Sequence, residues 1–167
     1  LSDRNYFAFG TLNKYAVFVD SGRTDPNSTV TIENNYIGTN QAGIAFGGSP
    51  YAAGGIGVDG FASNGITSIK NNVVNGDFDS AAIGTSHAGD LSIDGNIIGF
   101  ASNGTTPQAN MVSNHGVLVY SMNPIDHELD VNVSNNKQRG ADTRGLYVSG
   151  SSTVQSNYLV STNTFRE

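Results

Sequence analysis

One pattern of apolar and polar positions recurs along the chain: an apolar residue, two others, an asparagine, one other, and a second apolar residue. It is clear in "TVTIENNYIG" at 29–38 and in "LSIDGNIIGF" at 91–100. The asparagines in this pattern are Asn5, Asn35, Asn72, Asn96, Asn136 and Asn157, and the first and fifth copies are incomplete. Recurrence of one phrase at intervals of 21 to 40 residues is the signature of a repeat protein.

A second pattern stands between the copies of the first: a small residue, an apolar one, any residue, and an apolar residue or threonine. Its copies are Ala16–Val19, Gly55–Val58, Ala82–Thr85, Gly116–Val119 and Gly145–Val148. The two patterns alternate without exception, and apolar residues in both follow a period of two, which predicts short strands. Gly, Asn, Asp and Ser dominate between the strands, as in turns. No stretch shows a helical period.

Two short strands in a repeat of about 21–24 residues predict an all-β, right-handed parallel β-helix of about six coils. We expect a single solenoid over 1–167 that is a segment of a longer protein. Successive coils lie about 4.8 Å apart, so equivalent residues form columns. The asparagine column is then structural, because asparagine tolerates left-handed backbone and bonds to local backbone and to stacked copies. A β-sandwich with many Asn turns is the alternative.

Charge and composition exclude several classes. A formal net charge of −6 argues against nucleic acid and an anionic membrane surface as partners. The chain has no cysteine, which excludes a disulfide framework and a thiolate metal site. No apolar run approaches the roughly 20 residues that a membrane-spanning helix needs. With 20 Asn and 21 Gly, the composition favours turns over helices.

Two copies carry a longer phrase, "NNYIGTNQAGIAF" running on to "GGIGV" at 34–58 and "GNIIGFASNGTTPQANMVSNHGVLV" at 95–119. These stretches resemble the right-handed parallel β-helix proteins of the pectate-lyase-like superfamily. In particular, they resemble the Asn-x-Ile-Gly-Thr-x-x-x-Gly insert of large bacterial secreted and cell-surface β-helix proteins. The second copy departs from it with Phe100 in place of threonine. The resemblance implies an extracellular or cell-surface location. The inserts at 38–54 and 99–114 both lie between the asparagine turn and the second strand, so we expect them to project from the same corner.

The second strand predicts an outward face with candidate binding residues. Its outward columns are Phe18, Gly57, Gly84, Leu118 and Tyr147, and then Asp20, Asp59, Ser86, Tyr120 and Ser149. Small residues in the second and third coils form a floor between aromatic groups. Sugar rings stack on aromatic faces, so Phe18, Tyr120 and Tyr147 are candidate substrate-binding residues for a polysaccharide or cell-surface glycan. Alternatively, a loop or another subunit covers this face.

Asp20 and Asp59 are neighbours on adjacent coils, with Cβ atoms about 5 Å apart. Carboxylates this close are typical of retaining glycosidases and of calcium sites. The two residues are therefore candidates for catalysis and for binding Ca²⁺, the one cofactor we consider. The alternative is a solvated pair whose carboxylates turn away from each other.

Other motifs predict less. "GIGVDG" at 55–60 matches a dinucleotide-binding phrase, but it is itself a strand and no helix follows, so we exclude nucleotide binding. Glu33, Lys70 and Asp94 are expected to stack as a surface charge ladder. "NPIDHELD" at 123–130 could be a metal or acid–base cluster, or a solvated loop.

Three functions remain open. The first is a non-catalytic stalk, filament or adhesive, carbohydrate-binding module. The second is a polysaccharide lyase or glycoside hydrolase that uses Asp20 and Asp59. The third is a segment of a trimeric phage tailspike. No polar cap is evident at either end, so we expect neighbouring coils or subunits as partners.

Overall fold

The computed structural model describes residues 5–7, 15–20, 29–40, 52–60, 65–87, 89–108, 113–121, 129–150 and 156–166. This part of the chain forms strands and contains no helix that could cross a membrane. The strands are β1 (Tyr6–Phe7), β2 (Tyr15–Asp20), β3 (Thr29–Glu33), β4 (Tyr36–Ile37), β5 (Ala52–Gly60), β6 (Ile66–Lys70), β7 (Val73–Val74), β8 (Phe78–His87), β9 (Asp90–Asp94), β10 (Ile97–Ile98), β11 (Ser113–Ser121), β12 (Leu129–Ser134), β13 (Lys137–Arg139), β14 (Ala141–Ser149), β15 (Ser156–Ser161) and β16 (Thr164–Arg166).

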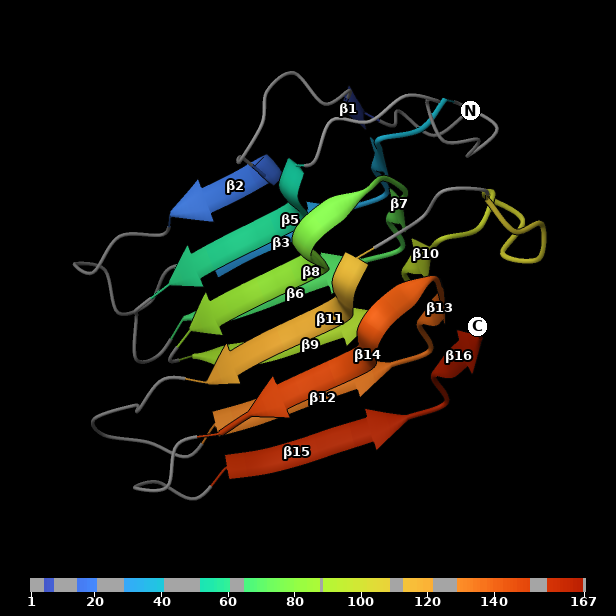
Figure 1. The fold of residues 1–167 in the computed structure, drawn as a ribbon. Helices are drawn as coiled ribbons and strands as arrows, with labels where there is room; N and C mark the ends of the chain where they lie inside the picture. The colour runs from blue at the N-terminus through green and yellow to red at the C-terminus, as the bar shows by residue number, and fades with distance from the viewer. Residues whose placement is uncertain are drawn as a thin grey trace.

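The strands form three parallel sheets, and every third strand along the chain belongs to the same sheet (Figure 1). Face A is the sheet β1-β4-β7-β10-β13-β16, face B is β2-β5-β8-β11-β14, and face C is β3-β6-β9-β12-β15. The chain is a parallel β-helix, which confirms the predicted fold class. It has five coils rather than six, because the sixth copy of the asparagine pattern contributes only β16 beyond the fifth coil. Each coil has three strands instead of two, because the asparagine pattern bends around a corner from face C to face A.

The core consists of the columns that the period of two predicts. On face B, Ile56 pairs with Ile83 and Ile83 with Val117, and all three are buried. On face C, Ile69 and Ile93 are paired neighbours and have no exposed surface. Burying each such side chain stabilises the fold by roughly 1.5–3 kcal/mol relative to leaving it exposed. The inward pattern of the sequence therefore places the core correctly.

The small residue that opens the second pattern makes room at a corner of the coil. A Cβ atom on Gly55 would meet the Val74 side chain and the Ala82 carbonyl. A Cβ on Gly116 would overlap the Gln138 side chain, and one on Gly145 would overlap the Phe165 ring. These positions therefore stay small because side chains from the following strand of face A fill the corner.

The asparagine column is a hydrogen-bonded ladder at the corner between faces C and A. Asn35 donates from its backbone N–H and its Nδ2 to the Oδ1 of Asn72, both at 3.0 Å. Asn72 donates in the same way to Asn96, and Asn96 to Asn136, at 2.9–3.0 Å. The amides of Asn72, Asn96 and Asn136 also donate to a backbone carbonyl of the previous coil, as in the 2.9 Å bond from Asn72 Nδ2 to the Ile32 oxygen. The column asparagines thus hold adjacent coils together.

Two details of this column differ from the prediction. The left-handed backbone belongs to the residue before the column asparagine, as at Asn34 (φ 58°), Asn71 (φ 55°) and Asn135 (φ 56°). The last member of the ladder is Asn163, which accepts from the backbone N–H of Asn136 at 3.0 Å. The assignment of Asn157 to the column was therefore wrong.

Asn157 lies within β15 and bonds to the Asp130 carboxylate across the coils at 3.0 Å. The phrases Val154/Asn157/Leu159 and Val160/Asn163/Phe165 fit the sequence pattern equally well. The parallel register, which pairs Val133 with Val160, selects the second phrase.

Candidate functional site

The outward side of face B is a lattice of three columns across five coils. The inter-strand register aligns these columns as Tyr15, Gly54, Ala81, His115 and Arg144; Phe18, Gly57, Gly84, Leu118 and Tyr147; and Asp20, Asp59, Ser86, Tyr120 and Ser149. The second and third columns are those predicted from the sequence.

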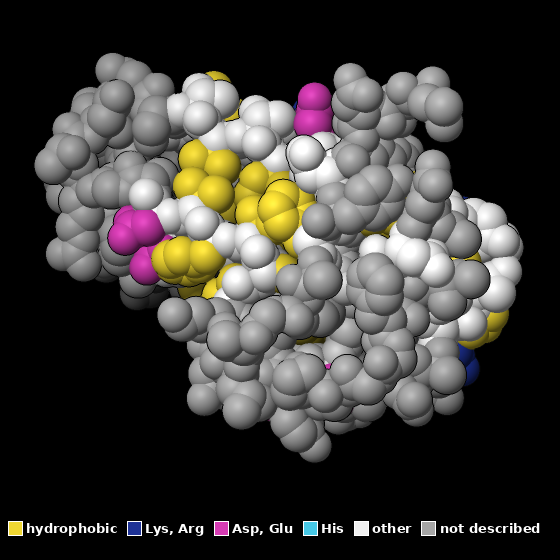
Figure 2. Space-filling view, turned by 90° about the horizontal axis from the view of Figure 1, so that it is seen from above, with side chains coloured by type: hydrophobic (Ala, Val, Ile, Leu, Met, Phe, Trp, Pro, Cys, Tyr) yellow, Lys and Arg dark blue, Asp and Glu magenta, His cyan; other side chains and the backbone are white. Residues whose placement is uncertain are grey.

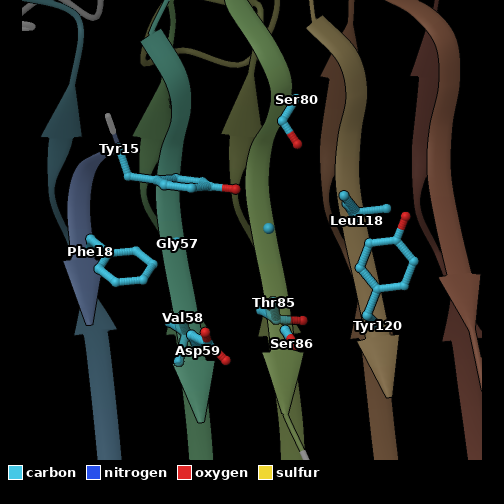
Figure 3. A pocket seen from close by; sticks show the side chains of 11 residues that line it. Tyr15, Phe18, Gly57, Val58, Asp59, Ser80, Thr85, Ser86, Leu118 and Tyr120 are labelled. Carbon is cyan, nitrogen blue, oxygen red and sulfur yellow. The ribbon is translucent and has the colours of Figure 1, made fainter. Parts of the chain in front are cut away.

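A trough crosses this lattice in the second and third coils, where the first two columns carry only Gly54, Gly57, Ala81 and Gly84. Tyr15 and Phe18 border it on the first coil, and Leu118 and Tyr120 border it on the fourth. Figure 3 shows these side chains on both sides of β5 and β8. The pocket has a volume of about 260 Å³, below the roughly 300–1,000 Å³ of sites that enclose a drug-sized ligand. It therefore suits a ligand that is held by one face.

Tyr15 lies across the floor of the trough, a position that the sequence pattern did not predict. A Cβ on Gly57 would stand 2.8 Å from Tyr15 Cδ1, and one on Gly84 would stand 3.1 Å from the Tyr15 hydroxyl. The ring thus extends from β2 over β5 toward β8 (Figure 3). Its centroid lies 5.6 Å from that of Phe18, with 29° between the planes.

The sequence pattern predicts the wrong direction for Tyr15, because strict alternation gives it the same inward direction as Val17. In the structure both Gly55 and Ile56 face the interior, so the period of two breaks at the start of each face B strand. Because two consecutive residues face inward, the residue before them faces outward, which places Tyr15 and Gly54 in the first outward column.

The two candidate aromatic walls are accessible. Phe18 is 54% exposed and Tyr120 is 46% exposed. Tyr147 does not line the pocket. Its ring instead packs edge-on against Tyr120 at 6.0 Å between centroids, and the guanidinium carbon of Arg144 lies 4.7 Å from its centroid. Tyr147 therefore supports the Tyr120 wall from the neighbouring coil.

Asp20 and Asp59 are adjacent in register, as the sequence predicts. Asp59 lines the pocket, and its Oδ1 atom is buried without a hydrogen-bond partner. Asp20 is exposed and does not line the pocket. The described residues contain no group of three or more His, Asp or Glu side chains that could hold a metal ion. The acidic end of the trough is therefore formed by Asp59, with the exposed Asp20 beside it in the register.

The remaining candidates lie away from the trough or outside the described residues. Glu33, Lys70 and Asp94 are consecutive in the register of face C, so the predicted charge ladder is in place. The connector at 122–128 is outside the described residues, as are 41–51 and 109–112 of the two inserts.

A search for related proteins among protein-family models, curated proteins and solved structures finds no match to this chain. The trough on face B is thus the feature from which a function can be argued.

Proposed function

We propose that the chain is a non-catalytic binding module that holds a neutral polysaccharide in the face B trough. The observation that supports this most directly is the pair of exposed aromatic rings, Phe18 and Tyr120, on opposite sides of a floor of small residues over which the Tyr15 ring lies. Their strands are three coils apart, about 14 Å between backbones. That width leaves room for sugar rings to lie between the walls, with an apolar face against each aromatic group.

The acidic end of the trough supports a ligand rich in hydroxyl groups. Asp59 is partly exposed and lines this end of the trough, so its carboxylate can accept a hydrogen bond from a ligand donor. A sugar hydroxyl is such a donor, and Ser86 stands beside Asp59 in the register as a second polar contact. The net charge of −6 favours a neutral glycan over an acidic one.

The proposal extends to an extracellular or cell-surface role as part of a stalk or adhesive protein. The phrase Asn35–Thr39 supports this extension, because it resembles the insert of bacterial surface β-helix proteins. Such a solenoid would present the trough on its side while its ends connect to other coils.

Calorimetric titration with saccharides selected on a glycan array tests the binding proposal. We expect Phe18→Ala and Tyr120→Ala each to weaken binding about tenfold, because each removes a stacking surface. The control is Tyr158→Ala, a tyrosine of similar exposure (40%) on face C, and it should leave affinity unchanged. Equal affinity of wild type and Tyr120→Ala, or no binding across neutral glycans, would contradict the proposal.

The enzymatic alternative, a polysaccharide lyase or glycoside hydrolase, is favoured only by the adjacency of Asp20 and Asp59. We expect Asp59→Asn to weaken saccharide binding a few-fold while thermal stability is kept or raised, because it removes a charge with an unpaired buried oxygen. Wild type should release neither new reducing ends nor unsaturated sugars. Glycan cleavage that Asp59→Asn abolishes would instead establish catalysis.

A further inference from the structure

The Tyr15 ring closes the trough at one end, over β5. Added Cβ atoms on Gly54 and Gly57 would both meet this ring, the first at Cε1 and the second at Cδ1. Gly57 and Gly84 line the pocket. Gly54 and Ala81, in the neighbouring outward column of the same two strands, do not line it. The open space over β5 therefore stops at the Tyr15 ring, which Figure 3 shows crossing that strand.

A β-bulge in β8 brings a hydroxyl group to the same end of the trough. Asp79 and Ser80 stand opposite one residue of β5 and one residue of β11, so β8 has an extra residue here. A bulge gives a side chain a different direction from the one that strict alternation predicts. Ser80 lines the pocket, and a Cβ on Gly84 would lie 3.1 Å from the Tyr15 hydroxyl. The hydroxyl groups of Ser80 and Tyr15 therefore both lie near β8 at this end (Figure 3).

The opposite end of the pocket is also polar, while its two sides are apolar. Asp59 and Ser86 pair in the register and line this opposite end. Phe18 and Tyr120 form the two sides, on the first and fourth coils. Figure 2 looks down the solenoid onto the first coil and shows acidic side chains directly beside hydrophobic ones at the surface. The described side chains thus give the pocket two polar ends and two apolar sides.

This arrangement matches one sugar ring better than a row of rings. A pyranose carries hydroxyl groups around its rim and C–H groups on its faces, and these faces stack on aromatic side chains. Serine and tyrosine hydroxyls donate and accept hydrogen bonds, and a carboxylate accepts them. The pocket volume of about 260 Å³ is below the roughly 300–1,000 Å³ of sites for drug-sized ligands. A longer chain lying along β5 would have to continue over Gly54, which the Tyr15 ring covers.

We propose that the pocket binds the terminal ring of a neutral glycan chain and excludes rings in the interior of a chain. This inference rests on the glycan binding proposed for the trough, and it adds which part of the glycan is bound. Tyr15 determines this specificity, because its ring occupies the position that the next sugar would need. The rest of the chain leaves the pocket away from Tyr15, so each chain holds one protein at its end.

Calorimetric titration across chain lengths tests this proposal. The probes are linear homo-oligosaccharides of glucose, galactose, mannose and N-acetylglucosamine, from the monosaccharide to the hexasaccharide. We expect at least one series to bind with a Kd that changes less than about threefold with chain length, and with one protein per chain. A Kd that falls further as the chain grows, or several proteins per hexasaccharide, would overturn end recognition but leave glycan binding in place. No binding in any series would contradict both proposals.

Two variants of Tyr15 separate the closing ring from its hydroxyl group. Tyr15→Ala opens the trough over Gly54, so we expect the hexasaccharide of the bound series to gain more than about threefold in affinity over its monosaccharide. Tyr15→Phe keeps the ring, and its Kd should stay independent of chain length. A length-independent Kd in Tyr15→Ala, or a length-dependent one in Tyr15→Phe, would overturn the role of the ring. The wild-type titration needs no variant, so it tests end recognition even if Tyr15→Ala fails to fold.

Discussion

Replacement of Asn72 by alanine is expected to lower the free energy of unfolding by about 3–5 kcal/mol. The Asn72 amide has no exposed surface and makes four hydrogen bonds. Alanine would leave the Asn35 N–H and the Ile32 carbonyl buried without partners, and each such loss costs about 1–3 kcal/mol. Urea denaturation followed by circular dichroism measures the change.

Asn157 provides the matched control for this experiment. It also carries one amide in the same sequence pattern, but it is exposed, and within the described part of the chain its side chain has one hydrogen bond, to Asp130. We expect Asn157→Ala to change the free energy of unfolding by less than about 0.5 kcal/mol. Equal effects at the two positions would show that the ladder does not stabilise the stacking of coils.

Gly99→Ala is expected to destabilise the fold by about 2–4 kcal/mol, for a different reason. Gly99 follows β10 with φ of +76°, a left-handed conformation that costs a residue with a side chain roughly 1–2 kcal/mol. A Cβ there would also collide with the carbonyl oxygen of Arg139 on the next coil. The Gly99 N–H donates to the buried Asn75 Oδ1 at 2.9 Å, which holds the Gly99 backbone in place and opposes a shift away from the Arg139 carbonyl.

Gly84→Ala separates this effect from a general intolerance of added methyl groups. Gly84 does not have a left-handed φ, and its nearest heavy atom would be the Tyr15 hydroxyl at 3.1 Å, the end of a flexible side chain. We expect a change within about 1 kcal/mol of wild type in either direction. Thermal denaturation of both variants decides the matter, and a Gly99→Ala protein as stable as Gly84→Ala would refute the argument.

The predicted parts of the fold are those that depend on residues close together in sequence. Alternation within Ile56–Val58 and Ile83–Thr85 identified the inward columns, because side-chain direction in a strand follows the backbone locally. Stacking then repeats the same environment in each coil, so one correct phrase locates several others. The outward columns with Phe18, Asp59 and Tyr120 followed from the same alternation, which is why most of the trough could be predicted.

The strands of face A, each two or three residues long, were missed for a physical reason. A strand such as β4 at Tyr36–Ile37 is too short to show a period, and its place in a sheet is visible only when six such strands are stacked. The count of strands per coil therefore required the inter-coil hydrogen bonds.

The sequence by itself determined that this protein is a solenoid, which side chains fill it, and that asparagines recur at one corner. Only the tertiary structure decided that Asn163 and not Asn157 ends the ladder, and that Tyr15 lies over the glycine floor. Both outcomes depend on contacts between coils: the pairing of Val133 with Val160 fixes the register at the last corner. The inward turn of both Gly55 and Ile56 shifts the first outward column. A local pattern leaves two registers equally acceptable, and hydrogen bonds between residues 24 to 40 positions apart select one of them.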